Sequence, residues 1–354
     1  MSSIGLSPSD SSALAGGTDR PRVAAICVTH NSRELLPDVI ASLRRQSGLA
    51  EMRIVVVDSG SSDDSVEVAR QLVPSSNVLR LPGNLGYAAG INRGVHHSGV
   101  IGGADVFLVL NPDITLAQDA VADLARAVLA PGGGIAAPTL RDEHGELLFS
   151  LRRRPTYATV ASEALFGGPL AHRLRLPTEV LWDPVDYEGD SQIAWATGGA
   201  LALSADCVRA VGLWDESYFL YDEEVDYCLR ATRAGLRATH VAAATGTRRM
   251  GTGASLLAYV LIRVNRVRLM RQHHGPAVGG LVRATLLIGE ALRAASGRPE
   301  ARAALQALAR RWDAATVVSR CADGSRSTAG DDGAGAADRR PASRPGEDSG
   351  DRAV

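Results

Sequence analysis

The chain has 354 residues, of which 45% are hydrophobic and 22% are charged, and its formal net charge is −1. It can therefore bury a substantial core, and it has no overall positive field that would attract nucleic acid. The four cysteines form neither a Cys-x-x-Cys pair nor a zinc-like cluster with histidine, so we interpret them as reduced thiols of a cytoplasmic protein. We find no signal-peptide pattern and no run of about 18 apolar residues that would predict a membrane-spanning helix.

Composition divides the chain into four parts. Residues 1–20 are rich in Ser, Gly and Ala, which predicts a flexible leader. The main domain takes in residues 21–254, and basic helical patterns follow over residues 255–321. Residues 322–354 contain almost nothing apolar, so we expect a disordered tail.

In the first part of the main domain, short apolar runs alternate with helical patterns. The predicted strands are 23–28, 53–57, 78–81 and 106–110, and the predicted helices are 35–43, 65–72, 87–97 and 116–129. This alternation is typical of an α/β fold with a mostly parallel sheet and right-handed crossovers.

The rest of the chain is less regular. Residues 140–190 predict no regular element, and an apolar run over 193–203 is interrupted by Gly198 and Gly199. Residues 222–234 predict a helix with an acidic first turn, and residues 255–320 predict two or three helices.

Polar side chains follow three of the predicted strands, where ligands bind in parallel sheets. Asn111 and Asp113 flank Pro112 after one strand, and such paired oxygen ligands suit a hard divalent cation. The alternative for this turn is a plain Asx turn. Asp58 ends another strand and suits a contact to a base or a ribose, whereas Asp63 is also explained as a helix cap.

The segment from Gly83 to Gly94 contains glycines that allow a close approach to a ligand. It has neither a Gly-x-Gly-x-x-Gly fingerprint nor a Walker-type loop, which counts against a dehydrogenase or an NTPase. Further along, Asp222, Glu223, Glu224 and Asp226 crowd one helix start among aromatic residues. A solvated cap is one interpretation, and a general base whose pKa its neighbours raise is the other.

Six motifs occur in an order that resembles the inverting family 2 glycosyltransferases, which have the GT-A fold, and especially their bacterial rhamnosyltransferase-like branch. The motifs are Thr29-His30-Asn31, the run from Val56 to Asp63, the run from Asn84 to Asn92, the run from Leu110 to Asp113, Gly198-Gly199-Ala200, and the run from Phe219 to Asp226. The resemblance covers about residues 22–275 and predicts a GT-A nucleotide-sugar-binding domain followed by C-terminal helices.

This resemblance implies roles for individual residues. The donor would be bound by Thr29, Asn31, Asp58, Asp63, Asn84 and Asn92. Asn111 and Asp113 would bind Mg or Mn that bridges the donor diphosphate. Glu224 would be the catalytic base by its position in the acidic pair, with Glu223 as the competing candidate.

The sequence departs from the family at two places. The family's Glu-Asp pair is Glu223-Glu224 here, so the base is one methylene longer. The family usually has a histidine near position 248, where this chain has Arg248 and Arg249, and His240 comes too early in the sequence. We expect Arg248 to contact the diphosphate, since guanidinium groups match phosphate geometry.

Arginine dominates the C-terminal helical region. Between residues 248 and 320 there are thirteen arginines and three acidic residues. Helices with basic and apolar faces can lie on an anionic bilayer, so we expect contact with the inner face of the plasma membrane. The alternative is that these helices only cover the core.

The pattern as a whole predicts an inverting hexosyltransferase, with rhamnose from dTDP-rhamnose as the first choice of donor. The expected acceptor is a glycan or a polyprenyl-linked intermediate of the cell envelope. Galactofuranose, glucose or mannose are the alternative sugars, and a nucleotide-sugar-binding module without turnover is the alternative class.

Overall fold

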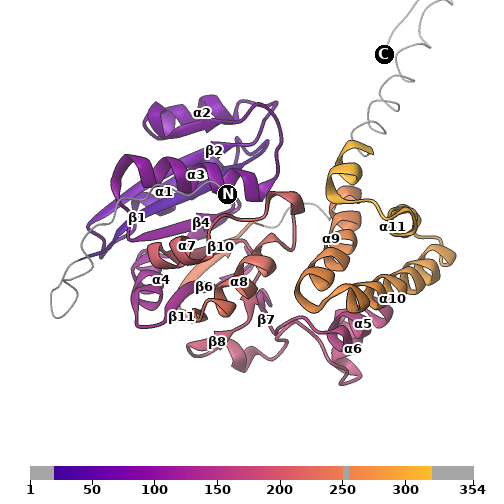
Figure 1. Ribbon diagram of the computed structural model, residues 1–354. Helices are drawn as coiled ribbons and strands as arrows, with labels where there is room; N and C mark the ends of the chain where they lie inside the picture. Colours follow the sequence, from indigo (N-terminus) through magenta and orange to yellow (C-terminus); the bar gives the residue numbers. More distant parts are fainter. Residues whose placement is uncertain (1–19, 250–254, 321–354) are drawn as a thin grey trace, which may run out of the picture.

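The computed structural model describes residues 20–249 and 255–320, and its centre is a nine-stranded sheet. Four parallel strands form one half of it, in the spatial order β3-β2-β1-β4 (Figure 1). Their bounds are Arg22–Thr29 for β1, Glu51–Asp58 for β2, Val78–Arg80 for β3 and Val106–Leu110 for β4. The predicted parallel α/β fold is confirmed, and all four of these strands were foreseen.

The other half of the sheet mixes strand directions. β10 is antiparallel to both of its neighbours, β4 and β6, while β6 and β11 run parallel. The short strands β5 and β8 pair antiparallel with β11, and β7 pairs with β9 in a separate ribbon. The bounds are Ile114–Leu116 (β5), Gly133–Arg141 (β6), Leu151–Arg152 (β7), Ser191–Ile193 (β8), Trp195–Ala196 (β9), Ala200–Ser204 (β10) and Arg237–Arg248 (β11).

Helices cover both faces of the sheet. One core includes Ile26 together with side chains of α3, α7 and α8, and the other includes Cys27 together with side chains of α1, α2 and α4. Neighbouring strand residues serve opposite cores because side chains alternate across a strand. The bounds are Leu36–Arg44 (α1), Ser65–Leu72 (α2), Tyr87–Gly102 (α3), Ala120–Leu129 (α4), Ala205–Val211 (α7) and Glu223–Arg233 (α8).

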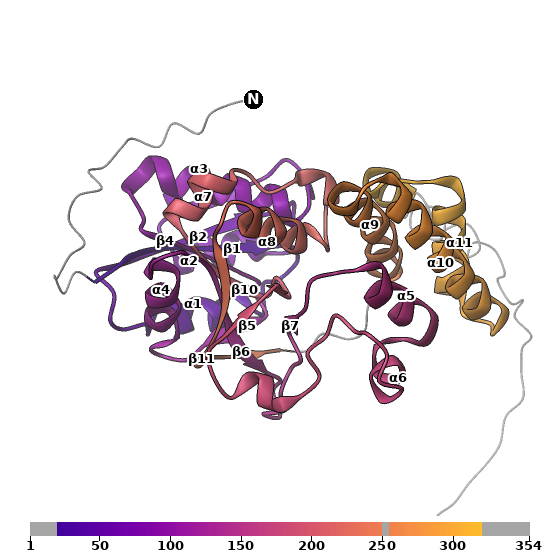
Figure 2. The ribbon, with the colours of Figure 1, turned by 60° about the horizontal axis from the view of Figure 1, so that its bottom comes forward.

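The C-terminal helices form a separate layer beside the sheet. α9 (Leu256–His274), α10 (Pro276–Ala295) and α11 (Pro299–Arg310) pack on one another, and α5 (Tyr157–Phe166) joins them through α10. Figure 2 shows α5 and α6 (Gly168–Arg173) on the same side as these helices, away from the sheet. No helix of the described ranges is long and apolar enough to cross a bilayer.

Two expectations about regular structure were wrong. The helix predicted from residue 116 begins at Ala120, because Ile114–Leu116 extends as β5 along β11. The segment 140–190 contains α5 and α6, and α5 starts with a capping box between Thr156 and Thr159. The expected disordered tail lies outside the described residues, as do the boundary at 254/255 and all of the expected leader except residue 20.

Candidate active site

The predicted strand ends meet at one edge of the sheet. Thr29 lies opposite Asp58 in the β1–β2 register, and β4 runs beside β1 on the other side. Directly after β4, the backbone N–H of Asn111 donates to the carbonyl of Gly199 at 2.9 Å. The sheet therefore brings together the Thr29, Asp58 and Asn111 motifs with the Gly198-Gly199 pair.

Asp58 is fully buried and shapes the loop that follows β2. Its carboxylate accepts hydrogen bonds from the backbone N–H of Ser61, at 3.0 Å, and from the Ser61 hydroxyl. Asn31, in a left-handed conformation with a φ of 51°, accepts from the backbone N–H of Ser62 at 2.8 Å. Beside them the hydroxyl of Thr29 is buried without a partner. Asp58 and Asn31 thus hold the loop, and the Thr29 hydroxyl is free to bind.

Asp63 fulfils the role of a helix-start residue. It accepts hydrogen bonds from the backbone N–H groups of Ser65, at 3.1 Å, and Arg33, at 3.3 Å. Burial raises its pKa, but these bonds and the Ser65 hydroxyl outweigh burial and leave the pKa below its usual value.

The two asparagines of the glycine-rich segment have different surroundings. Asn84 is exposed, and its side-chain oxygen accepts from the backbone N–H of Gly86 at 3.1 Å. Gly86 has a φ of 90°, and a Cβ there would lie 2.3 Å from the carbonyl oxygen of Phe219. Asn92 is buried and bonds both the N–H and the carbonyl of Trp214, at 2.9 and 3.0 Å. Asn84 therefore lies at the surface, whereas Asn92 anchors the segment that precedes α8.

Asp113 is held by an arginine of the last strand. The Nε of Arg248 donates to Oδ2 of Asp113 at 2.9 Å, while Oδ1 of Asp113 is buried and has no partner among the described residues. The pairing of β11 with β5 places Arg248 opposite Ile114 and so beside Asp113. His240 lies earlier in β11, buried against Thr139, with 2.8 Å between its Nε2 and the threonine hydroxyl. It is Arg248, not a histidine, that meets Asp113.

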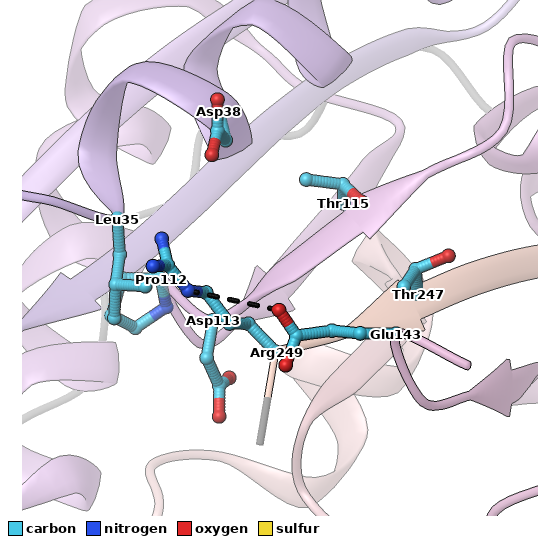
Figure 3. Close-up of a pocket in the computed structure, with 8 residues that line it drawn as sticks. All are labelled: Leu35, Asp38, Pro112, Asp113, Thr115, Glu143, Thr247 and Arg249. Carbon is cyan, nitrogen blue, oxygen red and sulfur yellow. Dashed lines mark ion pairs between the residues drawn. The ribbon is translucent and has the colours of Figure 1, made fainter. Parts of the chain in front are cut away.

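A small cavity of about 140 Å³ adjoins the backbone of this turn. Figure 3 shows the Arg249 side chain directed to Glu143, with 3.8 Å between Nε and Oε1. The Asp113 carboxylate points away from the side chains of Asp38 and Thr115 (Figure 3). The carboxylate therefore lies on the same side of the turn as Arg248.

The turn has oxygens for a metal ion but not a full set of protein ligands. No group of three or more His, Cys, Asp and Glu side chains in the described part of the chain could hold a metal by itself. The unpartnered Oδ1 of Asp113 and the half-buried Asn111 of the same turn offer hard oxygen ligands. Mg²⁺ is commonly held by one or two carboxylates together with substrate phosphates. The residues therefore fit a metal that is bound jointly with a phosphorylated donor.

The backbone before α8 has an unusual conformation. Phe219, Tyr221 and Asp222 all have positive φ values, of 63°, 70° and 68°. Residues other than glycine hold such conformations only where the surroundings enforce them, and such sites are often functional. Here the side-chain amide of Asn265 on α9 donates to three carbonyls, each at 2.9 Å, which belong to Tyr218, Leu220 and Tyr221.

An arginine of α9 fixes the end of this segment. Arg266 donates to both carboxylate oxygens of Asp222, at 3.1 and 2.8 Å, and also to Glu179. Burial raises the pKa of Asp222 to about 6, although Arg266 acts to lower it. Asp226, one turn later, is fully buried and bonds Arg230 and His273, each at 2.7 Å. Asp222 and Asp226 thus hold α8 in place through these contacts, which do not involve Glu223 and Glu224 between them.

Glu223 and Glu224 are both buried, and each has an Oε2 without a partner. Burial, followed by the charge of Asp222, raises the pKa of Glu224 to about 7, against the lowering effect of its own N–H and that of Gly198. Burial and the charge of Glu224 raise the pKa of Glu223 well above its usual value. Glu224 can therefore exchange a proton with a ligand near neutral pH, and its negative charge favours the protonated form of Glu223.

Gly198 and Gly199 connect the acidic pair with the Asn111 turn. A Cβ at Gly198 would lie 3.5 Å from the Cβ of Glu224, so Glu224 borders this glycine. The carbonyl of Gly198 accepts from the Tyr87 hydroxyl at 3.1 Å, and that of Gly199 accepts from Asn111. Burial raises the pKa of Tyr87, and the charges of Glu223, Glu224 and Asp113 raise it further. The acidic pair and Asp113 therefore lie within one electrostatic neighbourhood.

Tyr87, Asn265 and Arg266 were not among the residues predicted for the site. Tyr87 lies within the motif from Asn84 to Asn92, and its aromatic ring could have identified it as a site residue. Between Val260 and Arg271 of α9, Asn265 is the one uncharged polar residue among apolar residues and arginines, and this departure from the pattern could have singled it out.

The chain is similar in sequence to known proteins of one family. Residues 24–177 match the sequence profile of glycosyl transferase family 2. The chain carries a family 2 glycosyltransferase domain. This glycosyltransferase is similar to the N-acetylglucosaminyl-diphospho-decaprenol L-rhamnosyltransferase of Mycobacterium tuberculosis, with 28% identity over 230 residues that cover 62% of this chain and 73% of the relative. It is 29% identical over 142 residues to the rhamnosyltransferase WbbL of Escherichia coli, covering 39% of this chain and 50% of that one.

Solved structures support the fold of the glycosyltransferase. A mannosyltransferase of Pyrobaculum calidifontis, solved in complex with GDP-Man and Mn²⁺, superposes with a TM-score of 0.50 at 15% identity, covering 82% of this chain and 80% of that one. This likeness confirms the predicted GT-A fold, with its mostly parallel sheet.

Proposed function

We propose that this glycosyltransferase transfers rhamnose, with inversion, from a nucleoside diphosphate donor to a hydroxyl of a lipid-linked or polysaccharide intermediate of the cell envelope. The observation that supports this most is the position of Glu224, buried with a pKa of about 7 and separated by Gly198 and Gly199 from the Asn111 turn. A proton acceptor on one side and phosphate ligands on the other are what an inverting displacement needs. The names of two relatives, both rhamnosyltransferases, favour rhamnose.

Glu224 would act as the general base. In its ionised form it takes the proton of the acceptor hydroxyl while that oxygen attacks the anomeric carbon of the donor. The bond from the anomeric carbon to the diphosphate breaks on the opposite face, so the configuration inverts. Burial and the charge of Glu224 raise the pKa of Glu223, so the negative charge of the pair would lie on Glu224.

Asp113, Asn111 and Arg248 would receive the diphosphate. Arg248 already donates to Asp113, and its remaining N–H groups match phosphate oxygens. A divalent ion, Mg²⁺ or Mn²⁺, held by Asp113, Asn111 and the donor phosphates, would neutralise charge on the departing diphosphate. The Thr29 hydroxyl, next to the loop that Asp58 and Asn31 hold, would bind the nucleoside.

The catalytic assignment is tested with a panel of nucleotide sugars. Purified protein is incubated with a cell-envelope lipid extract as the source of acceptor and with dTDP-rhamnose, UDP-galactofuranose, UDP-glucose or GDP-mannose, with and without Mg²⁺ or Mn²⁺, and released nucleoside diphosphate is measured. Metal-dependent release from dTDP-rhamnose, lost in Glu224→Gln, supports the proposal. Release from another donor would identify a different sugar as the one transferred. Donor binding without any release would indicate a binding module without turnover.

The C-terminal helices offer a surface for an anionic membrane, where a lipid-linked acceptor would lie. An apolar stripe runs along the exposed side of α10, consisting of Ala277, Leu281, Ala284, Ile288, Ala291, Leu292 and Ala295. Ile288 and Leu292 are 58% and 63% exposed. Over residues 255–320 the exposed charged residues are Asp313 and six arginines: Arg271, Arg298, Arg302, Arg310, Arg311 and Arg320. Apolar insertion combined with positive charge favours an anionic lipid surface over a second protein.

Liposome sedimentation tests the membrane surface. Binding should require anionic lipid, weaken with salt, and fall at least severalfold in Ile288→Asn/Leu292→Asn. Leu129→Asn, at an exposed leucine that ends α4, outside the C-terminal helices, is the control. Equal binding of all three proteins would contradict the assignment of this face.

A further inference from the structure

A second cavity lies between the C-terminal helices. It measures about 440 Å³ and is lined by residues of α9 and α10, the end of α11 and the turn that follows. A volume of this size suits a small ligand. None of the candidate catalytic, donor-binding or metal-binding residues lines it, and Asn265, which supports the segment before α8, is the one residue that it shares with the site around Glu224.

Four arginines line this cavity, and three of them have no carboxylate partner among the described residues. Arg283 donates to the carbonyls of Leu308 and Ala309, at 2.8 and 3.0 Å, and these neutral groups leave its charge uncompensated. Arg271 and Arg311, both exposed, form no ion pair within the described ranges. The cavity therefore holds an excess of positive charge.

The remaining groups that line the cavity do not cancel its excess of positive charge. Arg268 pairs with Asp215 at 3.0 Å, yet its Nε is buried without a partner. The one acid in the lining, Asp313, accepts from the backbone N–H of Thr316 at 2.8 Å and so caps the helix that follows. Trp312 adds a flat aromatic wall. Uncompensated guanidinium groups next to an aromatic ring form a binding surface for an anion with an apolar or cyclic part.

We propose that this cavity, lined by Arg268, Arg271, Arg283, Arg311 and Trp312, binds a phosphate-bearing ligand. Guanidinium groups bind phosphate through paired, charge-assisted hydrogen bonds. The ligand is either a soluble phosphate ester or the headgroup of a membrane phospholipid, since both present the same group. The proposal does not rest on the donor sugar or on Glu224, and its test involves no turnover.

The cavity lies behind the segment that leads into the acidic pair. Asn265, which lines it, donates to the carbonyls of Tyr218, Leu220 and Tyr221, and its own side-chain oxygen is buried without a partner. The guanidinium of Arg268 lies 5.0 Å from the ring centre of Tyr218. A ligand in the cavity would therefore touch the side chains that hold residues 215–222 in place.

The first arm of the test uses inorganic pyrophosphate and a local signal. The indole N–H resonance of Trp312, assigned from its loss in Trp312→Phe, is followed by NMR during the titration. We expect a saturable shift in the wild type and at least tenfold weaker binding in Arg271→Ala/Arg311→Ala. Arg302→Ala, an exposed arginine outside the cavity, is the matched control and should behave as wild type.

A second variant fills the cavity without removing charge. Gly280 lines it, and a Cβ there would meet no atom within 4 Å, so Gly280→Leu can place its side chain in open space. Replacing a glycine within a helix also favours the helical state, so this variant should fold. It should weaken pyrophosphate binding even though every arginine remains.

The second arm distinguishes the two sources of phosphate with vesicles of phosphatidylglycerol, and of phosphatidylcholine as reference. If a lipid headgroup is the ligand, Arg271→Ala/Arg311→Ala should lose more binding to phosphatidylglycerol vesicles than Arg298→Ala/Arg302→Ala, which removes the same charge from the exposed arginines of this region, and Gly280→Leu should lose binding with every arginine in place. If the Trp312 signal shifts with pyrophosphate but Arg271→Ala/Arg311→Ala loses no more vesicle binding than Arg298→Ala/Arg302→Ala, and Gly280→Leu binds vesicles as wild type, the ligand is a soluble phosphate compound. No shift of Trp312 together with these same vesicle results would overturn the proposal.

Discussion

Arg248 and Asp113 form an ion pair in which the arginine Nε lies 2.9 Å from Oδ2, while the other carboxylate oxygen of Asp113 is buried and has no partner in the part of the chain that the structure describes. One carboxylate oxygen of Asp113 thus binds Arg248, and the other is available to bind a ligand. A divalent ion bound to Oδ1 would lie close to the guanidinium of Arg248, so a diphosphate could contact the ion and Arg248 together.

Asp113→Ala should abolish turnover and remove the metal dependence of donor binding, because the variant loses the Oδ1 ligand. Donor binding is measured by calorimetry with and without Mn²⁺, and turnover by release of nucleoside diphosphate. Asp206→Ala, at a carboxylate with 80% of its side chain exposed, is the control. Wild-type turnover and metal response in Asp113→Ala would show that this carboxylate holds no metal.

Arg248→Ala should lower kcat/KM for the donor by about ten- to a hundredfold, in line with the loss of a charge-assisted contact to phosphate. Arg249→Ala provides a matched comparison, since Arg249 is the next residue and its nearest carboxylate is Glu143 at 3.8 Å. If the two variants lose activity equally, the contact of Arg248 with Asp113 has no special role in donor binding.

Asp58→Ala should raise the KM for the donor more than it lowers kcat, because the nucleoside loop loses its anchor. The structure adds a second test, since Asp58 accepts its hydrogen bonds from Ser61. Ser61→Ala should reproduce part of the KM increase if Asp58 acts through the loop. An unchanged KM in Ser61→Ala, next to a large increase in Asp58→Ala, would instead indicate a direct contact of Asp58 with the nucleoside.

Glu224→Gln should be more stable than the wild type at pH 8. The pKa of Glu224 rises from an ordinary value of 4.5 to about 7, owing first to burial and then to Asp222. Folding therefore favours the protonated form, and the wild type loses stability as the pH rises from about 4.5 through about 7. Glutamine stays neutral, so the variant should have a higher Tm at pH 8 and nearly the same Tm at pH 4.5. Glu188→Gln, at an exposed glutamate, should show no such difference.

The sequence predicted the elements whose signals are local. The helix over 65–72 and the strand over 106–110 have the predicted bounds, because their apolar patterns and flanking polar residues are clear. The strand β5 was missed because three residues give too short a pattern, and its pairing with β11 joins segments more than 120 residues apart. The same limit applies to the site. Its motif residues were named in advance, but the contacts of Asn265 with the segment before α8 depend on how α9 docks.

The ion pair of Arg248 with Asp113 illustrates what an alignment of motifs predicts and what it does not. The sequence placed an arginine where the family usually has a histidine, and we expected it to contact the diphosphate. That its first partner is the carboxylate of the Asn111 turn follows from the register of β11 on β5, which no local pattern encodes.

The central claim is that Glu224 is the catalytic base, and single-turnover rates of Glu224→Gln and Glu223→Gln with the active donor test it most directly. Glu224→Gln keeps the shape of the side chain and removes its basicity, so kcat should fall by about a hundredfold or more while donor affinity changes little. Glu223→Gln should retain far more activity, because burial and the charge of Glu224 favour the protonated form of Glu223. A Glu224→Gln enzyme that turns over at the wild-type rate, next to an inactive Glu223→Gln, would contradict the assignment and transfer the role to Glu223.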